Sequence, residues 1–336
     1  MRPLLFRVLA SEKTGTGHLM RSLALAQAAE SCDIPSIFLL DTHASLIARK
    51  RHDWNYQIIS VPANLSVSNE GKWIAEQADE HDAAALIFDG YTFSPDVLKN
   101  SHHSNRCVVL MDDGMTSLTH LADIIVDPTA KERTSTEQQV FCYGSKYRLL
   151  RREFTTLSPK LIKERNGIAL NLGGSDPKNL TIHLLKAISN RLPDVPIRVV
   201  TGPAYSRLTE LDSCVASLPN PIQHIHNCQD MSEVWNNAKL AISAAGGSQF
   251  ELGVCATPSI LVVVAKNQKQ ATKAATMEGW ATAFDCIKTI PIDAIAKQVQ
   301  TLLDADLQAM SDRAKGLYDA EGAMRLLNNI AEYEND

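Results

Sequence analysis

Several features are scarce in this sequence of 336 residues, and each absence excludes a class of protein. No apolar run reaches the roughly 18 residues that a membrane-spanning helix needs, so we expect no membrane insertion. The apolar run from Leu4 to Leu9 is too short for a secretory signal and predicts a first strand instead. Basic charge is not in excess, because 33 Lys and Arg residues stand against 38 Asp and Glu residues, a net charge of −5. Nucleic acid is therefore not an expected partner.

The seven cysteines are scattered, and no two of them stand in a C-x-x-C pair. An odd number of separated thiols argues against a disulfide framework and against a zinc–thiolate site. We therefore expect reduced cysteines and a cytoplasmic protein. The histidine pairs His102-His103 and His224-x-His226 have no acidic or cysteine partner at ligand spacing, so we predict neither a metal nor a cofactor.

What the sequence does contain is an alternation of apolar strands with helix-capable stretches, which predicts parallel sheets covered on both faces. The expected strands are 4–9, 37–40, 84–89 and 107–111, then 167–172, 197–201, 222–225, 240–243 and 260–264. A polar stretch near residues 150–165 separates the two sets. We predict an α/β protein of two doubly wound Rossmann-like domains, residues 1–155 and 156–336, with a ligand cleft between them. Whether the final helices, within 291–333, pack back on the N-terminal domain stays open.

The first candidate site follows the first expected strand, at Gly15-Thr16-Gly17-His18, with Arg21 one turn further on. Two glycines let the backbone approach a ligand closely. A helix N-terminus disfavours imidazolium, so a neutral His18 is suited to take a proton from water. A plain turn followed by a polar helix start is the alternative interpretation of the same residues.

Acidic residues follow two further strands of the first half. Asp89 is placed to orient an imidazole, and Tyr91 to donate to a sugar or phosphate oxygen, although a capped turn is the alternative. For Asp112-Asp113 we favour a structural or hydrogen-bonding role over a metal site, because adjacent strand residues point in different directions. The basic run 148–152 predicts a solvated face near the domain junction.

The second half has two strand–glycine–helix transitions, Gly173-Gly174-Ser175 and Gly246-Gly247-Ser248. Backbone amides at such turns suit a diphosphate. Glu251 follows the second turn and is placed for a ribose diol, and Asn267-Gln268 can bind a sugar or phosphate through side-chain amides. A single glycine turn is ordinary, but two in one half favour a nucleotide-diphosphate site.

In their order along the chain these motifs resemble the PseG/SpsG family over about residues 4–290. The motifs that carry the resemblance are Gly15-Thr16-Gly17-His18 with Arg21, Asp89-x-Tyr91, 110–113, 122–128, 143–154, 173–177, 243–251 and Asn267-Gln268. The resemblance implies the MurG-like GT-B fold and a metal-independent UDP-sugar hydrolase of pseudaminic acid biosynthesis, acting on a diacetamido-trideoxy-altropyranose. It further implies that His18 is catalytic with Tyr91 near it, that Glu251 binds the uridine ribose, and that Asn267 contacts substrate.

Three functions compete at this point. The first is a hydrolase in which water activated by His18 attacks the anomeric carbon with inversion, in nonulosonic acid or surface polysaccharide biosynthesis. The second is a GT-B glycosyltransferase that passes the sugar to an acceptor hydroxyl. The third is a non-catalytic nucleotide-sugar binding module.

Overall fold

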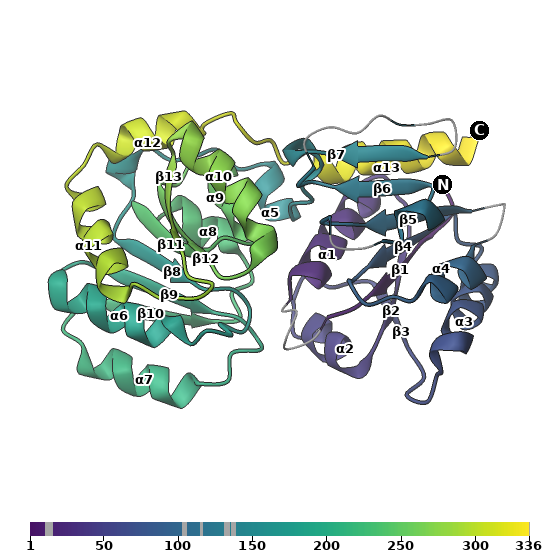
Figure 1. Ribbon diagram of the computed structural model, residues 1–336, viewed down its shortest axis with the longest axis horizontal. Helices are drawn as coiled ribbons and strands as arrows, with labels where there is room; N and C mark the ends of the chain where they lie inside the picture. Colours follow the sequence, from purple (N-terminus) through teal and green to yellow (C-terminus); the bar gives the residue numbers. More distant parts are fainter. Residues whose placement is uncertain (11–15, 103–105, 115–116, 131–134, 136–138, 336) are drawn as a thin grey trace. The chain divides into compact units, whose positions relative to one another are not determined.

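The computed structural model describes residues 1–10, 16–102, 106–114, 117–130, 135 and 139–335. The chain divides into two compact units, each built on a parallel sheet (Figure 1). The first unit contains Met1–Arg152 and Ala320–Asp336, and the second contains Glu153–Asp319. The sequence places the division after residue 155, whereas in the structure the chain leaves the first unit after Arg152 and returns at Ala320.

The first unit holds a seven-stranded parallel sheet in the order β3-β2-β1-β4-β5-β6-β7. Its strands are β1 (Leu4–Val8), β2 (Ser36–Leu40), β3 (Gln57–Ser60), β4 (Ala85–Asp89), β5 (Cys107–Met111), β6 (Ile124–Asp127) and β7 (Val140–Tyr143). The helical elements are α1 (Gly17–Glu30), α2 (Thr42–Arg49), α3 (Val67–Glu80), α4 (Pro95–Ser101), η1 (Thr119–Leu121), η2 (Ser145–Tyr147) and α13 (Gly322–Asn335), with α5 (Arg152–Thr155) at the division.

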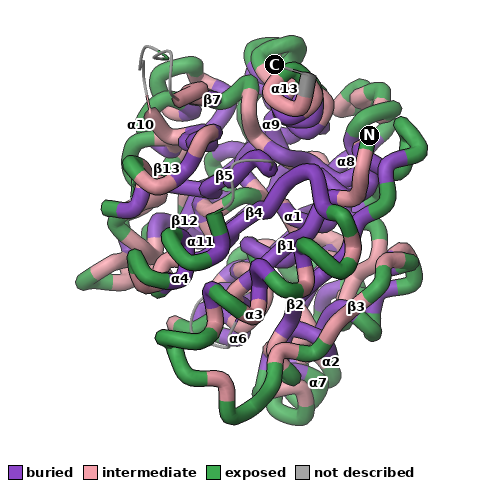
Figure 2. Tube along the Cα trace, turned by 90° about the vertical axis from the view of Figure 1, so that its right-hand side faces the viewer, coloured by how far each residue is buried: buried purple, intermediate pink, exposed green. Residues whose placement is uncertain are grey.

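Successive side chains of β1 point to opposite faces of this sheet, and both faces are covered by helices. Leu4, Phe6 and Val8 belong to one apolar core, which also contains residues of α1 and α13. Leu5 belongs to a second core, which contains residues of α3 and α4. Figure 2 shows β1, β4 and β5 buried along their length. A strand that is buried on both faces has a continuous apolar sequence, and this pattern allowed β1, β4 and β5 to be predicted.

The second unit holds a six-stranded parallel sheet in the order β10-β9-β8-β11-β12-β13. Its strands are β8 (Ile168–Asn171), β9 (Ile197–Thr201), β10 (Ile222–His226), β11 (Leu240–Ala244), β12 (Ser259–Val263) and β13 (Ala281–Asp285). Its helical elements are η3 (Ile162–Glu164), α6 (Leu180–Arg191), α7 (Leu208–Ser217), α8 (Met231–Asn236), α9 (Ser248–Val254), η4 (Lys266–Gln268), α10 (Lys269–Glu278), α11 (Ile292–Leu303) and α12 (Leu307–Ala314). The two doubly wound sheets confirm the predicted fold class.

Four strands, β3, β6, β7 and β13, are absent from the sequence prediction. Three of them lie at sheet edges, where one side of the strand has no neighbour. In β3 every residue is half-buried or exposed, so no apolar run marks it. The fourth, β6, rests on only three consecutive apolar residues, 124–126.

Both sheets reverse their strand order at one point. In the first sheet β1 lies beside β4, and in the second β8 lies beside β11. Ligands of open α/β sheets bind beyond the carboxyl ends of the strands at such a point. The candidate residues of each unit gather there. Within the described ranges, no helix is long and apolar enough to cross a membrane.

Candidate functional site

His18 lies in the first turn of α1, just beyond the carboxyl end of β1. The helix begins at Gly17, and the carbonyl oxygen of Thr16 accepts its first hydrogen bond, from the amide of Met20. The His18 side chain is only 5% exposed. Gly15, predicted as part of the same loop, lies outside the described residues.

Asp89 ends β4, the neighbour of β1, and its carboxylate meets the His18 ring. Nδ1 of His18 lies 2.6 Å from Oδ1 of Asp89. Arg21 Nη2 also lies 3.1 Å from Nδ1, but the contact with Asp89 is the shorter of the two. Because a carboxylate only accepts hydrogen bonds, we assign the proton of a neutral imidazole to Nδ1. Nε2 then keeps its lone pair, and no described residue hydrogen-bonds to it. This is the tautomer that a general base needs.

The carboxylate of Asp89 is fully buried, and every partner it has supports its negative charge. Arg21 donates from Nε to Oδ2 over 2.7 Å and from Nη2 to Oδ1 over 2.5 Å, and Ser22 Oγ donates to Oδ2 over 3.0 Å. Burial alone raises the pKa of Asp89. The charge of Arg21 and the bond to His18 outweigh burial and hold that pKa below its ordinary value.

A second carboxylate, Asp113, completes the cluster from the loop after β5. Arg21 Nη1 donates to its two oxygens over 3.0 and 2.8 Å, and the Tyr91 hydroxyl donates to Oδ2 over 2.6 Å. The Tyr91 ring lies edge-on to the His18 ring, with centroids 4.5 Å apart. In this structure the phenol proton of Tyr91 is therefore given to Asp113, where the sequence predicted donation to a sugar or phosphate oxygen.

The prediction of a solvated basic run at 148–152 is wrong for two of its arginines. Arg148 Nη1 lies 3.9 Å from Asp113 Oδ1, with 16% of its side chain exposed. Arg151 is buried, and its Nη1 lies 3.4 Å from Met20 Sδ on α1. Only Arg152 keeps more than half of its side chain exposed. Arg148 thus places a positive charge beside the second buried carboxylate, although burial lowers the pKa of its guanidinium.

The charges of this cluster sum to zero when His18 is neutral. Arg21 and Arg148 carry the positive charges, and Asp89 and Asp113 carry the negative ones. A proton taken up by His18 at Nε2 would make the ring an imidazolium, whose Nδ1–H already faces the carboxylate of Asp89. The cluster can therefore accept a proton and stabilise the resulting cation.

In the second unit, the loop after β8 is shaped for close backbone approach. The side chain of Asn171 donates to the carbonyl of Val200 over 3.0 Å and accepts from the amide of Gly173 over 3.2 Å. Gly173 has φ +88°, a conformation that favours glycine. A Cβ on Gly202 would lie 2.4 Å from the Cα of Gly174, so these two backbones pack directly together.

Of the residues that follow these glycines, Asp176 binds the protein backbone, and Ser175 is free of that role. Asp176 accepts from the amides of Leu180 and Thr181 and so caps α6. Ser175, between Gly174 and Asp176, is half-buried. Ser175 is therefore the polar side chain of this loop that remains a candidate for substrate.

The loop after β11 brings two predicted segments together. A Cβ on Gly246 would meet only Nε2 of Gln268, at 3.9 Å, and one on Gly247 would meet nothing. Gln268 accepts from the amide of Val264 over 2.8 Å, which fixes the loop after β12. Its NH2 group thus faces the glycine loop, while Ser248 and Asn267 are half-buried nearby in sequence.

Glu251 has a partner that the sequence did not indicate. Nε1 of Trp235, a fully buried indole on α8, donates to Glu251 Oε2 over 3.0 Å. Glu251 itself is half-buried on α9. The two residues lie sixteen positions apart on different helices, so no local spacing pattern links them.

The histidine pairs bind polar neighbours within the protein. His102 Nε2 lies 3.4 Å from Asp123, and His103 is outside the described residues. Thr201 Oγ1 lies 2.9 Å from His224 Nε2 and 3.1 Å from His226 Nδ1. Among the side chains that the structure describes, no group of three or more His, Cys, Asp or Glu is placed to hold a metal ion.

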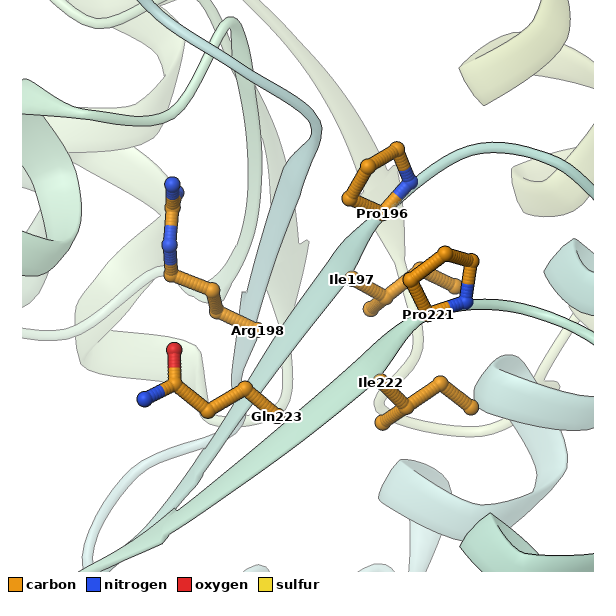
Figure 3. A pocket seen from close by; sticks show the side chains of 6 residues that line it. All are labelled: Pro196, Ile197, Arg198, Pro221, Ile222 and Gln223. Atoms are coloured by element: carbon orange, nitrogen blue, oxygen red, sulfur yellow. The ribbon is translucent and has the colours of Figure 1, made fainter.

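A hollow in the second unit lies where strands β9 and β10 begin (Figure 3). Its lining residues begin β9 and β10 or directly precede them, and they are Pro196, Ile197, Arg198, Pro221, Ile222 and Gln223. In a parallel sheet all strands begin at one end and finish at the other, and the glycine loops follow the carboxyl ends. The hollow therefore contains none of the predicted site residues.

Comparison with known proteins agrees with the fold of the chain. Residues 169–326 match the Glycosyltransferase family 28 C-terminal domain. The chain is 22% identical over 336 residues to the spore coat polysaccharide biosynthesis protein SpsG of Bacillus subtilis, covering 95% of this chain and 96% of that protein. Acinetobacter baumannii MurG has a similar structure, with TM-score 0.70 at 15% identity over 99% of this chain and 100% of that one. The chain is a PseG/SpsG-like protein with the MurG-like GT-B fold.

A further relative of this SpsG-like chain is the uncharacterized protein MJ1062 of Methanocaldococcus jannaschii, at 26% identity over 274 residues. That alignment covers 77% of this chain, which spans only 55% of the archaeal protein. The match to the family 28 domain includes both glycine loops of the SpsG-like chain together with Trp235 and Glu251. The His18 cluster lies outside the matched residues.

Proposed function

We propose that this SpsG-like protein is a hydrolase that releases UDP from a UDP-linked diacetamido-trideoxy hexose. Water attacks the anomeric carbon on the face opposite the diphosphate. The new C–O bond forms as the bond to the diphosphate oxygen breaks, and that oxygen keeps the bonding electron pair. One proton of the water passes to His18, and the anomeric configuration inverts because a single displacement occurs.

The contact between His18 and Asp89 is the observation that carries this proposal. Asp89 accepts the hydrogen bond from Nδ1–H, and Nε2 is left as the basic atom. UDP is already a good leaving group, whereas water is a poor nucleophile, so the reaction gains most from a base. An ionised Asp89 also stabilises the imidazolium that forms during the attack.

The second unit is the proposed nucleotide site. The backbone at Gly173-Gly174 and Gly246-Gly247 carries no side chains, so a diphosphate can approach it closely. The Gly173 amide donates to Asn171, so the amides assigned to the diphosphate are those of Gly174, Gly246 and Gly247. Glu251, oriented by Trp235, is assigned to the ribose hydroxyls. Ser175, Ser248, Asn267 and Gln268 are assigned to the phosphate and sugar oxygens. Arg21 is assigned to Asp89 rather than to direct substrate contact.

The sugar and its pathway come from the family resemblance, and the cytoplasmic location comes from the scattered cysteines. Release of the free sugar suits a route to nonulosonic acids or to a surface polysaccharide, in which a later enzyme uses the hydrolysed product.

A glycosyltransferase is the second candidate, because residues 169–326 match a glycosyltransferase domain. In that reaction His18 would take the proton of an acceptor hydroxyl instead of water. The geometry at Asp89 serves either nucleophile. The two functions therefore differ only in what reaches Nε2.

Incubation with a panel of UDP-sugars, with and without candidate acceptor sugars, tests the proposal. We expect free UDP without an acceptor, and proton NMR of the first-formed sugar should show the inverted anomer. UDP release that depends on an acceptor would favour the transferase. Tight UDP-sugar binding without turnover under both conditions would indicate a binding module.

A further inference from the structure

We propose that Asp113 is a positioning residue that fixes the Tyr91 hydroxyl as a hydrogen-bond acceptor beside His18. The proposal rests on the proposed function, because it concerns the group that meets Tyr91 during hydrolysis. It reverses the role predicted from the sequence, in which Tyr91 donates to a sugar or phosphate oxygen.

The first step is the direction of one hydrogen bond. A phenol has a single proton, and that of Tyr91 is directed to Asp113 Oδ2 over 2.6 Å. The hydroxyl oxygen keeps its lone pairs, and Asp113 is its sole hydrogen-bond partner among the described residues. Any further group that binds this oxygen must therefore donate.

The second step is the charge on Asp113. Arg21 Nη1 donates to both oxygens of Asp113, and Arg148 lies 3.9 Å away. These cations keep the carboxyl ionised, so it has no proton to give to Tyr91. A neutral carboxamide at this position has an NH2 group that can donate to the phenol and turn the Tyr91 proton outward.

The third step concerns the group that Tyr91 meets. A phosphate oxygen only accepts, so it is a poor partner for this hydroxyl. A donor is available either as the second O–H of the attacking water or as an N–H or O–H of the sugar. The His18 and Tyr91 rings are in edge-on contact at 4.5 Å, which brings the acceptor into the neighbourhood of the base.

The first unit offers a matched control for this pair. The Tyr56 hydroxyl donates to Glu30 Oε2 over 3.0 Å, and Arg152 also binds that carboxylate. Tyr56 and Glu30 thus repeat the phenol, carboxylate and arginine combination away from His18. Variants of this pair report the general effect of losing such a bond.

The kinetic test compares Tyr91→Phe, Asp113→Asn and the double variant with Tyr56→Phe and Glu30→Gln. We expect each single change at the site to lower kcat/KM by up to about tenfold, the usual effect of one hydrogen bond. The double variant should be no worse than the poorer single one, because the two residues act as a unit. Loss in kcat would indicate water as the donor, and a rise in KM would indicate a sugar group. Losses that multiply in the double variant, or normal kcat/KM in Asp113→Asn, would overturn the proposal.

A second measurement does not depend on turnover. In protein labelled with 13C-tyrosine, the hydroxyl proton of Tyr91 should give a downfield, slowly exchanging resonance that Tyr91→Phe removes. Asp113→Asn should shift it upfield or broaden it, while Glu30→Gln leaves it in place. An unchanged resonance in Asp113→Asn would refute the positioning role even in a protein that hydrolyses no UDP-sugar. If Asp113→Asn does not fold, Tyr91→Phe, which keeps the ring, tests the same bond from its other end.

Discussion

The indole Nε1–H of Trp235 donates to Oε2 of Glu251 over 3.0 Å, and it does so from a fully buried side chain. The bond joins α8 to α9, so the orientation of the carboxylate is set by the packing of the second unit. A carboxylate held in this way loses little conformational freedom when it binds a diol. The pair therefore gives the proposed ribose site its rigidity.

Replacing Glu251 by Ala should weaken UDP binding by about 1–3 kcal/mol, the range for a hydrogen bond to a charged group. Isothermal titration calorimetry with UDP measures the change. Trp235→Phe keeps most of the buried ring but removes the N–H, so we expect a smaller loss of affinity than in Glu251→Ala. Unchanged UDP affinity in Glu251→Ala would contradict the assignment of this residue.

Replacing His18 by Asn should leave UDP binding intact and lower kcat by roughly 10²–10⁴-fold, the usual contribution of a general base. The reason is that an asparagine side chain can still occupy the space beside Asp89 but cannot take a proton from water. Steady-state kinetics on the best UDP-sugar of the panel, with calorimetry on UDP, separates the two effects. Near-normal turnover would remove His18 from the mechanism.

Asp113 should make the stability of the protein depend on pH in the acid range. Burial raises the pKa of its carboxyl, but Arg21 and Arg148 outweigh burial and hold that pKa far below its ordinary value. As the pH falls, the unfolded chain takes up a proton first, so the stabilisation is full above the unfolded pKa of about 3.9 and is lost below it. The free energy of unfolding of Asp113→Asn should therefore fall less between about pH 6 and about pH 3 than that of the wild type. Urea titrations at the two pH values measure the free energies of unfolding. An equal fall with pH in the variant and the wild type would count against the ion pairs of Asp113.

Hydrolysis should continue in the presence of EDTA. Backbone amides at Gly174 and Gly246 are proposed to meet the charge that develops on the diphosphate, which removes the need for a bound cation. The measurement is UDP release before and after chelation. Activity lost in EDTA and restored by magnesium or manganese would show that the diphosphate is held differently.

The sequence predicted the two sheets because their central strands are buried on both faces. Ile168, Ala169 and Leu170 of β8, for example, are all fully buried and form an unbroken apolar run. The edge strand β3 carries only Ile58 and Ile59 between polar residues. An edge strand pairs on one side only and is less buried, so its sequence has no long apolar run by which to predict it. Complete burial made most central strands predictable, but the short buried strand β6 was missed, and the partly exposed edge strand β10 was predicted.

The candidate site was predictable only in part, for a related reason. His18 and Asp89 follow strands, and strand ends in such folds meet at one edge, so their proximity could be anticipated. Arg148 shows no such local sign, because its contact with Asp113 joins distant parts of the chain. Long-range pairs of this kind are set by tertiary packing rather than by spacing along the chain.

The return of the chain to the first unit has a consequence for how the protein is made. Leu326, Leu327 and Ile330 of α13 are buried in the same core as β1 and α1, and a Cβ on Gly322 would lie 2.2 Å from the carbonyl oxygen of Arg148. Because the ribosome builds the chain from its N-terminus, this core lacks a helix until residues 320–336 have emerged. The second unit, with its contiguous residues 153–319, is complete before them. We therefore expect the first unit to complete its folding after the second. The surface of α1 that α13 covers stays uncovered while the second unit is synthesised.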